Sequence, residues 1–423
     1  MPGHVGRALA MPLLAVCIVG GFCRAEDEAP RHVLRGVLDF RLIAADASVS
    51  WLEGGLGKPR YGGDGEQRST KLRIPQASIL LQTRIADVQS VRLHVNLDLE
   101  PHHEQQRGRV NVIEAFWGYR PVLSPYVRLK VRAGVFFPPV SLENSGPAWT
   151  TPYSITTSAA NSWIGEEVRT IGVECGVVFS RLTDQFSVVG ALFGANDPAG
   201  SLLAWRGWSS HDRQSGMWER LPLAPIPSIT PSGLFPLQSP YVEPFREVDG
   251  RPGYYAAGSW IHGSRIEING IYWRNRGDRV SVKDGQYAWK TRFVNAGAKL
   301  ELPGSMTLLA QHMEGRSEMG PGSLVDIAFY SDYALVSAAR GRHRISMRYE
   351  RFGVSDRDLN ISTDDNRERG SSWTAAYILR TGSRHRLATE LLWTRSDRPV
   401  RPSLGVPAAE AELIFQTAFR LMF

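Results

Sequence analysis

The sequence lacks two features that would place it in common structural classes. Beyond residue 25 it has no run approaching the ~20 apolar residues that a membrane-spanning helix needs, so a membrane could be crossed only by strands. It has three cysteines, and two of them fall within the first 25 residues. Cys175 alone remains, which excludes an intrachain disulfide framework and predicts a small apolar residue on a strand.

A concentrated charge of one sign is also missing. The formal net charge is +7, and removal of Arg7 and Arg24 with the N-terminal segment described next leaves +5. The excess is spread along the chain rather than gathered in a basic tail, so it carries no signature of nucleic-acid binding, and no nucleic-acid partner is expected. Inside a pore, the same excess would favour anions modestly.

The first residues have the pattern of an export signal. A positively charged start is followed by the apolar segment Ala8–Cys23 and, after Ala25, by an acidic stretch that begins at Glu26. An N-terminal membrane anchor is the alternative, which Pro12 and the short apolar run argue against. A lipoprotein signal is disfavoured because Phe22 stands where a small residue is expected. The expected organisation is a signal peptide at 1–25 and one mature unit at 26–423.

Alternating polarity marks the segment Val91–Glu100 as a strand. Its odd-numbered residues are apolar and its even-numbered residues are polar, over five consecutive alternations. A strand of a soluble β-sandwich with one buried face would show the same pattern, so the number of such strands has to distinguish a sandwich from a barrel. Fifteen further segments qualify: Leu34–Leu42, Gln76–Thr83, Val112–Tyr119, Tyr126–Phe136, Arg169–Phe179, Phe186–Phe193, Tyr254–His262, Ile266–Trp273, Arg292–Leu300, Met306–Glu314, Asp326–Val336, His343–Glu350, Trp373–Arg380, Arg386–Thr394 and Ala411–Phe423.

About 16 strands with apolar residues on one face and polar residues on the other predict an all-β fold, a transmembrane antiparallel β-barrel with inward-folded loops. The export signal, the even strand number and aromatic residues near strand ends favour a barrel in lipid over a sandwich. The aromatic residues expected to form interfacial girdles are Trp117, Tyr119, Tyr126, Trp260, Trp273, Trp289, Trp373 and Trp393.

The connections between these segments alternate in length. Short turns occur at Pro303-Gly304, Arg340–Arg342 and Thr381–Ser383, and long connections include Glu53–Thr70, Pro138–Glu167 and Asp356–Gly370. Short turns on the periplasmic side and long loops outside are typical of outer-membrane barrels. The longest connection, Asn196–Gly250, is rich in proline and tryptophan, and we expect it to fold over or into the barrel mouth.

The tail Ala411–Phe423 resembles the C-terminal signal of outer-membrane barrels. Leu413, Phe415, Phe419, Leu421 and Phe423 share one face, and the chain ends on an aromatic residue. The resemblance implies recognition of Phe423 by the barrel-assembly machinery and contact with outer-membrane lipid and lipopolysaccharide. We expect the tail to close the barrel by pairing with Leu34–Leu42, which turns Glu412, Gln416 and Arg420 inward.

A barrel of 16 strands leaves an aqueous channel, whereas a barrel of about eight strands is filled by side chains. The expected function is therefore passive diffusion of small hydrophilic solutes. The alternative is a structural or adhesive barrel plugged by 196–250. A barrel enzyme is not expected, because no nucleophile elbow or close Ser–His pairing is present. No cofactor or metal is expected, since neither the histidines nor the acidic loop near Asp356 has ligand spacing.

The inward positions of the predicted strands supply the candidates for the channel wall. Arg128, Lys130 and Arg132 alternate along one strand face, about 7 Å apart. Such a ladder either attracts anions or forms salt bridges with inward acidic residues that keep the lumen polar. The pore-lining candidates are Arg35, Arg41, Arg92, Asp98, Glu114, Arg128, Lys130, Arg132, Glu174, Arg344, Arg348 and Arg420.

Two segments resemble the phosphate-selective porins. Val135–Asn144 resembles the family's Phe-x-x-Pro-x-Ser-Leu-Glu segment, and His343–Phe352 resembles one of its late strands. The resemblance implies a 16-stranded barrel, usually trimeric, with an inward loop at Pro138–Glu167. The residues it proposes for the constriction are Ser141, Glu143, Asn144, Glu166 and Glu167. The segment Pro139–Val168 contains no Lys or Arg, so any preference for anions has to come from the wall.

Overall fold

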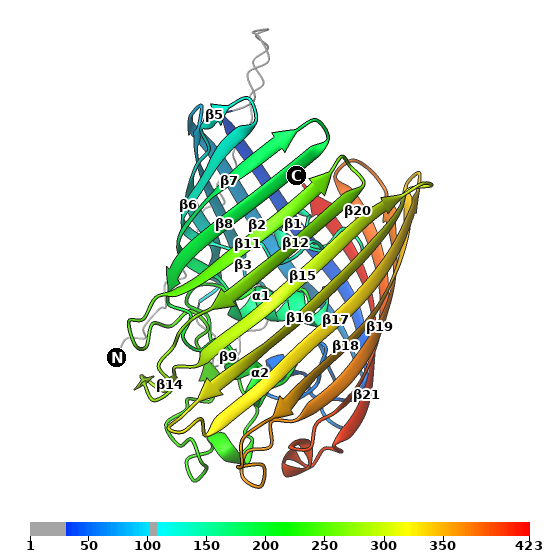
Figure 1. Ribbon diagram of the computed structural model, residues 1–423. Coiled ribbons are helices and arrows are strands. Elements are labelled where there is room, and N and C mark those ends of the chain that lie inside the picture. The colour runs from blue at the N-terminus through cyan, green and yellow to red at the C-terminus, as the bar shows by residue number, and fades with distance from the viewer. Residues whose placement is uncertain (1–30, 101–107) are drawn as a thin grey trace, which may run out of the picture. The chain divides into compact units, whose positions relative to one another are not determined.

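The computed structural model describes residues 31–100 and 108–423, so the expected signal peptide lies outside the described residues. Within these ranges, sixteen strands form one closed antiparallel barrel, as expected (Figure 1). The barrel strands are β1 (His32–Ala45), β2 (Ser69–Ala86), β3 (Gln89–Leu97), β4 (Val110–Tyr119), β6 (Val127–Phe136), β7 (Thr170–Arg181), β8 (Asp184–Gly194), β11 (Gly253–His262), β12 (Ile266–Arg274), β15 (Lys290–Leu302), β16 (Met306–Met319), β17 (Val325–Arg340), β18 (His343–Asp356), β19 (Glu368–Arg380), β20 (His385–Asp397) and β21 (Ala409–Met422).

The first and last strands close the barrel. β21 pairs antiparallel with β1 from Val37 opposite Met422 to Ala45 opposite Ile414. Leu413 and Phe415 face outward and are 40% and 43% exposed, while the side chains of Glu412, Gln416 and Arg420 are buried inside. This confirms both the predicted pairing and the predicted facing of the tail.

Several strands are longer than the alternation predicts. β2 begins at Ser69 rather than Gln76, and β18 runs to Asp356 rather than Glu350. In the β18 extension the pattern is reversed, with Phe352 and Val354 buried inside and Arg351 exposed outside, so the apolar-out rule does not detect it. β3 is shorter than predicted and ends at Leu97; beyond it, Glu100 turns inward and accepts hydrogen bonds from Arg60 and Tyr61.

A bulge corrects the facing predicted for β4. The register between β3 and β4 shifts between His94 and Val95, which leaves Ile113 as an extra residue on β4. Ile113 is therefore fully buried inside rather than facing outward with Ala115 and Trp117. A pattern with period two cannot reveal such an insertion.

Two of the predicted girdle residues do not lie on the outer wall. Trp273 faces inward on β12, and Trp289 lies in the connection that precedes β15; both are fully buried. Tyr126, Trp373 and Trp393 are exposed as expected. Trp289 packs against Trp205 of α2, and Trp273 packs against Phe193 and Phe293 on wall strands, contacts that strand-end position alone does not show.

One end of the barrel carries short turns and the other carries long loops, which we call the short-turn end and the long-loop end. The remaining elements are β5 (Val122–Ser124), which pairs with β6 at the short-turn end, and the loop elements η1 (Trp51–Glu53), η2 (Pro147–Trp149), α1 (Ala159–Glu167), α2 (Ser201–Trp205), β9 (Leu221–Pro222), η3 (Pro227–Ile229), β10 (Tyr241–Val242), β13 (Val282–Lys283), β14 (Gln286–Tyr287) and η4 (Arg401–Leu404). None of the helices in the described ranges is long and apolar enough to cross a membrane.

Candidate functional site

Two long loops enter the barrel and occupy part of its interior (Figure 1). The first runs from Phe137 to Arg169 and carries α1, and the second runs from Ala195 to Pro252 and carries α2. Every residue of α1 and of α2 is buried. We call these two loops the inner loops, because any route through the barrel has to pass beside them.

Aromatic packing holds the inner loops against the wall. Trp163 of α1 lies edge-on to Trp208 of the second loop and to Phe293 and Phe329 of the wall, with ring centroids 6.1, 5.4 and 5.4 Å away. Such buried edge-to-face pairs contribute about 0.5–1.5 kcal/mol each beyond the burial of their area. The inner loops are therefore packed parts of the fold.

The residues proposed for the constriction include several that anchor the first inner loop. Glu143 accepts hydrogen bonds from the Ser158 backbone N–H and from Asn161, and pairs with Arg348 of β18 at 2.8 Å. Glu143 and Arg348 are both buried, so neither side chain can meet a solute. Ser141 donates to Asn144 at 2.7 Å, which stabilises the turn that carries Glu143 inward.

Glu166 and Glu167 join the two inner loops to each other. Glu166 pairs with Arg206 at 2.5 Å and lies 3.1 Å from His211 Nε2. Burial raises the pKa of Glu166, but Arg206 and His211 outweigh it and hold that pKa at about 2. Glu167 accepts backbone N–H groups of Gly200 and Leu202 at the start of α2. The two carboxylates are buried, and their part in a constriction stays a prediction.

The predicted basic ladder on β6 divides into paired and unpaired members. Arg132 donates to both oxygens of Glu174, at 2.8 and 2.7 Å, and Lys130 lies 3.2 Å from the same carboxylate. Tyr255 also donates to Glu174, at 2.6 Å. Arg128 makes no ion pair with any residue that the structure describes, and it is exposed. Because Lys130 and Arg132 share one carboxylate, two of the ladder's three positive charges stay unneutralised, one of them on Arg128.

The inner wall across the barrel seam carries a buried charge cluster centred on Asp212 of the second inner loop. Asp212 lies 2.5 Å from Arg41, 3.3 Å from Arg60 and 3.7 Å from Arg420. Asp39 bridges Arg41 and Arg420 at 2.7 Å each. Burial raises the pKa of Asp212, but the neighbouring guanidinium groups hold it well below its usual range. Sequence patterns identified the wall members but not Asp212, because its loop has no periodicity.

Beside this cluster lies a narrow cavity between the second inner loop and strands β2–β4. Its volume is about 30 Å³, roughly the share of one liquid water molecule. Predicted Asp98 lines it, together with Arg60 and Arg213, which the prediction missed. Its full lining is Arg60, Pro75, Gln76, Asn96, Leu97, Asp98, Asn111, Asp212, Arg213, Gln214 and Glu219. Nearby, Arg92 pairs with Glu114 at 3.2 Å.

The short-turn end of the lumen is basic. A second cavity, of about 80 Å³, is lined by Arg344 of β18, Arg380 of β19 and Arg386 of β20, and no carboxylate takes part in its lining. Predicted Arg35 is exposed near the same end of β1. The alternation predicted Arg344 as a wall residue. It did not show that Arg380 and Arg386 lie beside Arg344, because that depends on how β18, β19 and β20 are aligned in the barrel.

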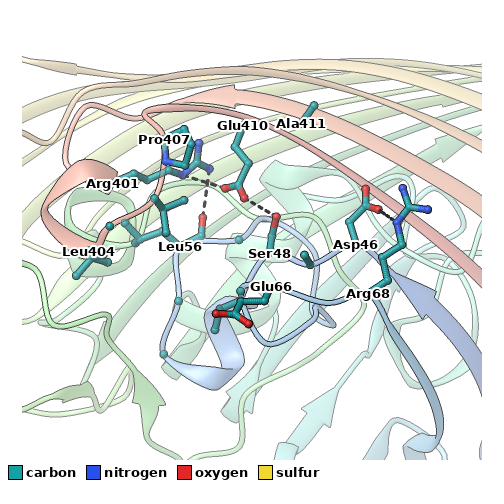
Figure 2. A pocket seen from close by; sticks show the side chains of 18 of the residues that line it. Asp46, Ser48, Leu56, Glu66, Arg68, Arg401, Leu404, Pro407, Glu410 and Ala411 are labelled. Atoms are coloured by element: carbon teal, nitrogen blue, oxygen red, sulfur yellow. Dashed lines mark hydrogen bonds and ion pairs between the residues drawn. The ribbon is translucent and has the colours of Figure 1, made fainter.

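A larger cavity, of about 720 Å³, lies where the first and last loops meet over the barrel seam (Figure 2). Glu410 accepts from Ser48 at 2.5 Å and lies 3.5 Å from Arg401, which also donates to the Leu56 carbonyl. Asp46 pairs with Arg68 at 3.1 Å. Because these charges are satisfied within the lining, the contacts fasten the two loops together.

Three carboxylates gather at the neck of the second inner loop. Asp197 accepts backbone N–H groups of Val248 and Asp249 at 2.6 and 3.2 Å, and oxygens of Asp197, Glu247 and Asp249 lie within 4.8 Å of one another. Burial is the main cause that raises the pKa of Asp197 to about 7, and the two acidic neighbours add to it. Within residues 31–100 and 108–423 this is the one group of three such side chains that could hold a metal ion. That the protein binds no metal stays a prediction.

Stability at this neck should depend on pH. The pKa of Asp197 rises from 3.8 in the unfolded chain to about 7, so the folded protein binds this proton more tightly and its stability falls as pH rises from about 4 to 7. Asp197→Asn should flatten that slope in thermal melts recorded in the presence of a chelator. Asp64→Asn, in an exposed loop, is the matched control. An unchanged slope in the Asp197 variant would contradict the assignment.

Comparison with known proteins adds evidence on the fold. No family model and no curated protein matches the sequence. Among solved structures, the chain is similar to the outer membrane channel DcaP of Acinetobacter baumannii, with a TM-score of 0.55, 11% identity, and 93% of this chain and 97% of that chain covered. It is also similar to an anion-selective porin from Comamonas acidovorans, with a TM-score of 0.52, 11% identity, and coverage of 93% and 99%.

A third similar structure is the trimer form of OmpT, an outer membrane protein of Vibrio cholerae. Its TM-score is 0.50 and its identity is 8%, with 93% of this chain and 99% of that chain covered. These three similarities extend over nearly the whole barrel. At such low identities they establish a porin-like fold and carry no residue roles.

Proposed function

We propose that this chain is an outer-membrane channel through which small hydrophilic solutes diffuse passively, with a weak preference for anions. The observation that carries the proposal is the polar interior of a closed sixteen-strand barrel whose short-turn end is lined by arginines without a neutralising carboxylate. A barrel of this size encloses more volume than its own wall side chains fill. On this proposal the inner loops narrow the path of a diffusing solute but do not close it.

The preference for anions rests on Arg128 and on the cluster Arg344, Arg380 and Arg386. The other members of the ladder, Lys130 and Arg132, share the single carboxylate of Glu174, so together they add one further net positive charge. The inward loop has no basic residue between Pro139 and Val168, so the phosphate specificity of the family it resembles is not part of the proposal. Weak selection by charge is what scattered wall arginines supply.

Reversal potentials in planar bilayers test this proposal. Arg386→Gln should shift the potential toward cations, because removing one charge about 8 Å from a permeating ion changes the ion's energy by about 0.5 kcal/mol in water, or its permeability about twofold. Arg128→Gln should act in the same direction. Arg342→Gln, in an exposed turn at the same end, is the control with the same change in charge. Absence of stepwise conductance in the wild type would contradict the proposal that the barrel is an open channel.

One observation favours a second candidate, a barrel closed by its own loops that serves a structural or adhesive role. All residues of α1 and α2 are buried, and the cavity beside Asp212 is only about 30 Å³. A closed barrel would carry no current until the second inner loop is removed. The same recordings therefore separate the two candidates.

The proposal includes three kinds of partner. The OmpT structure in trimer form supports a homotrimer. The outward Phe423, whose carbonyl accepts the Gly36 N–H at 2.8 Å, ends the closing strand, which supports recognition of the free tail by an assembly factor before closure. Exposed apolar residues such as Leu391 and Leu413 on the outer wall support contact with lipid and lipopolysaccharide.

A further inference from the structure

A groove of about 770 Å³ runs across the outside of strands β17–β20, toward the long-loop end. It starts at a set of exposed aromatic residues. Tyr349 and Trp373 pack together on neighbouring strands with ring centroids 4.7 Å apart, and Trp393 pairs with Trp373 on the next strand. Exposed aromatic residues of this kind mark the level at which the apolar core of a membrane meets its headgroups. The groove therefore lies at headgroup level.

Arginines follow the aromatic residues at once. Arg351 comes two residues after Tyr349, and Arg395 comes two residues after Trp393, both toward the long-loop end. A step of two residues along a strand keeps the side chain on the same face and advances it by roughly 7 Å. Arg369 and Arg367 complete the basic lining on β19 and the loop that precedes it. Four guanidinium groups thus border one concave surface.

Two of these arginines are not neutralised. Arg351 pairs with Asp332 at 3.0 Å, and Arg367 pairs with Asp365 at 2.7 Å. Arg369 and Arg395 are exposed and form no ion pair within the part of the chain that the structure describes. Two acidic residues also line the groove at its end, Asp356 and Asp397, and a third, Glu368, points inward and pairs with Lys58 instead. The unpaired guanidinium groups therefore remain available to a ligand.

Small residues form the floor of the groove. Ser355 of β18 and Ser371 of β19 line the groove between the arginines. Gly353 lies between Arg351 and Ser355 on the same face of β18. A Cβ atom on Gly353 would stand 2.6 Å from the Tyr330 ring, so glycine is needed for that ring to lie along the wall. A bulkier floor would fill the space between the guanidinium groups. The surface is thus shaped to admit a headgroup rather than only to carry charge.

We infer that this groove binds the phosphorylated sugar headgroup of a glycolipid in the outer leaflet, with Arg369 and Arg395 as its phosphate ligands. Guanidinium groups bind phosphate oxygens through paired, charge-assisted hydrogen bonds. The aromatic residues below the groove would contact the first part of the acyl chains. The inference rests on the proposed placement in the outer membrane and not on an open channel.

Lipid binding to the full chain, folded in detergent micelles, tests the inference. Native mass spectrometry with diphosphoryl lipid A should show affinity that falls at least about tenfold in Arg369→Gln/Arg395→Gln, since one charge-assisted contact is worth about a factor of ten. Lipid A that lacks both phosphates should bind with the same low affinity to the wild type and to this variant. Arg342→Gln/Arg384→Gln, in short turns at the opposite end, removes the same charge and should leave binding unchanged.

Three outcomes would overturn the inference. They are equal binding of diphosphoryl lipid A by wild type and the groove variant, equal binding of the phosphorylated and unphosphorylated lipids, and displacement of the lipid by equimolar inorganic phosphate, which would make the groove a general anion site. The groove variant should also conduct like the wild type, because both arginines lie outside the barrel. A channel failure and a lipid-binding failure can therefore be told apart.

Discussion

Replacement of residues 199–247 by a short Gly–Ser linker is expected to raise single-channel conductance severalfold. The exchanged segment carries α2, Trp208, Arg206 and Asp212, and its residues fill the interior beside the narrow cavity at β2–β4. β8 and β11 pair up to Phe193 opposite Gly253, so a short linker can join them without changing the barrel. Removing the segment should widen the space between this wall and the first inner loop.

Selectivity should change in the single variant Asp212→Asn rather than in that replacement, because residues 199–247 contain four arginines and four carboxylates and their removal leaves the net charge unchanged. Loss of Asp212 leaves Arg41, Arg60 and Arg420 facing the lumen with Asp39 and Glu100 as their remaining partners. The wall would then carry more unpaired positive charge, and the reversal potential should move toward anions. Planar-bilayer recordings at two salt gradients measure selectivity and conductance.

The tip of the same loop provides the matched control. Residues 231–234 are mostly exposed, so deleting them shortens the loop without opening the interior, and the conductance should stay at the wild-type value. If the long replacement conducts like the wild type, the route does not pass beside this loop. If only the replacement conducts, the barrel is closed in its native state and the structural or adhesive candidate is supported.

The barrel could be predicted from the sequence because its physical basis is local. A strand such as β3, with Leu93 outward and His94 inward, alternates because each face meets a different environment, and period two is visible in one segment. The same reasoning placed Arg128, Lys130 and Arg132 on one inner face. It failed at Ile113, where a bulge inserts a residue, and at Trp273, which is buried on the inner face against Phe193 and Phe293 of other strands.

The candidate site was predicted only in part because its geometry is set by contacts distant in sequence. Glu143 and Glu166 were correctly placed in an inward loop, but a loop without periodicity does not show which side chains anchor it. Their partners, Arg348 and Arg206, come from β18 and from the second inner loop. Asp212 carried no local signal, and the alternation of Arg386–Thr394 did not show that Arg386 would join Arg344 and Arg380. Charge balance across the barrel can be read only after the register is known.

The anchor at the root of the first inner loop gives the second large expected effect. Arg348→Met should lower the free energy of unfolding by about 3–5 kcal/mol, the usual cost of removing one partner from a buried ion pair. The change leaves Glu143 buried beside the Ser158 N–H and Asn161 without its cation. It also removes the hydrogen bonds that Arg348 donates to the carbonyls of Thr156 and Thr157 at 3.0 Å each.

The reciprocal change and the double variant decide whether the pair acts as a unit. Glu143→Gln keeps the shape and both loop hydrogen bonds but leaves Arg348 with Glu350, 3.5 Å away, as its nearest acidic partner. If Glu143 and Arg348 stabilise each other, the double variant loses less stability than the two single variants together, by about 0.5–3 kcal/mol. Denaturant unfolding of the barrel in lipid vesicles measures the three values.

Additive losses would mean that the loop is held by its aromatic packing around Trp163, and that the ion pair only fills the space between loop and wall. Coupled losses, with larger current fluctuations in either single variant, would mean that this pair fixes the loop whose position sets the width of the channel.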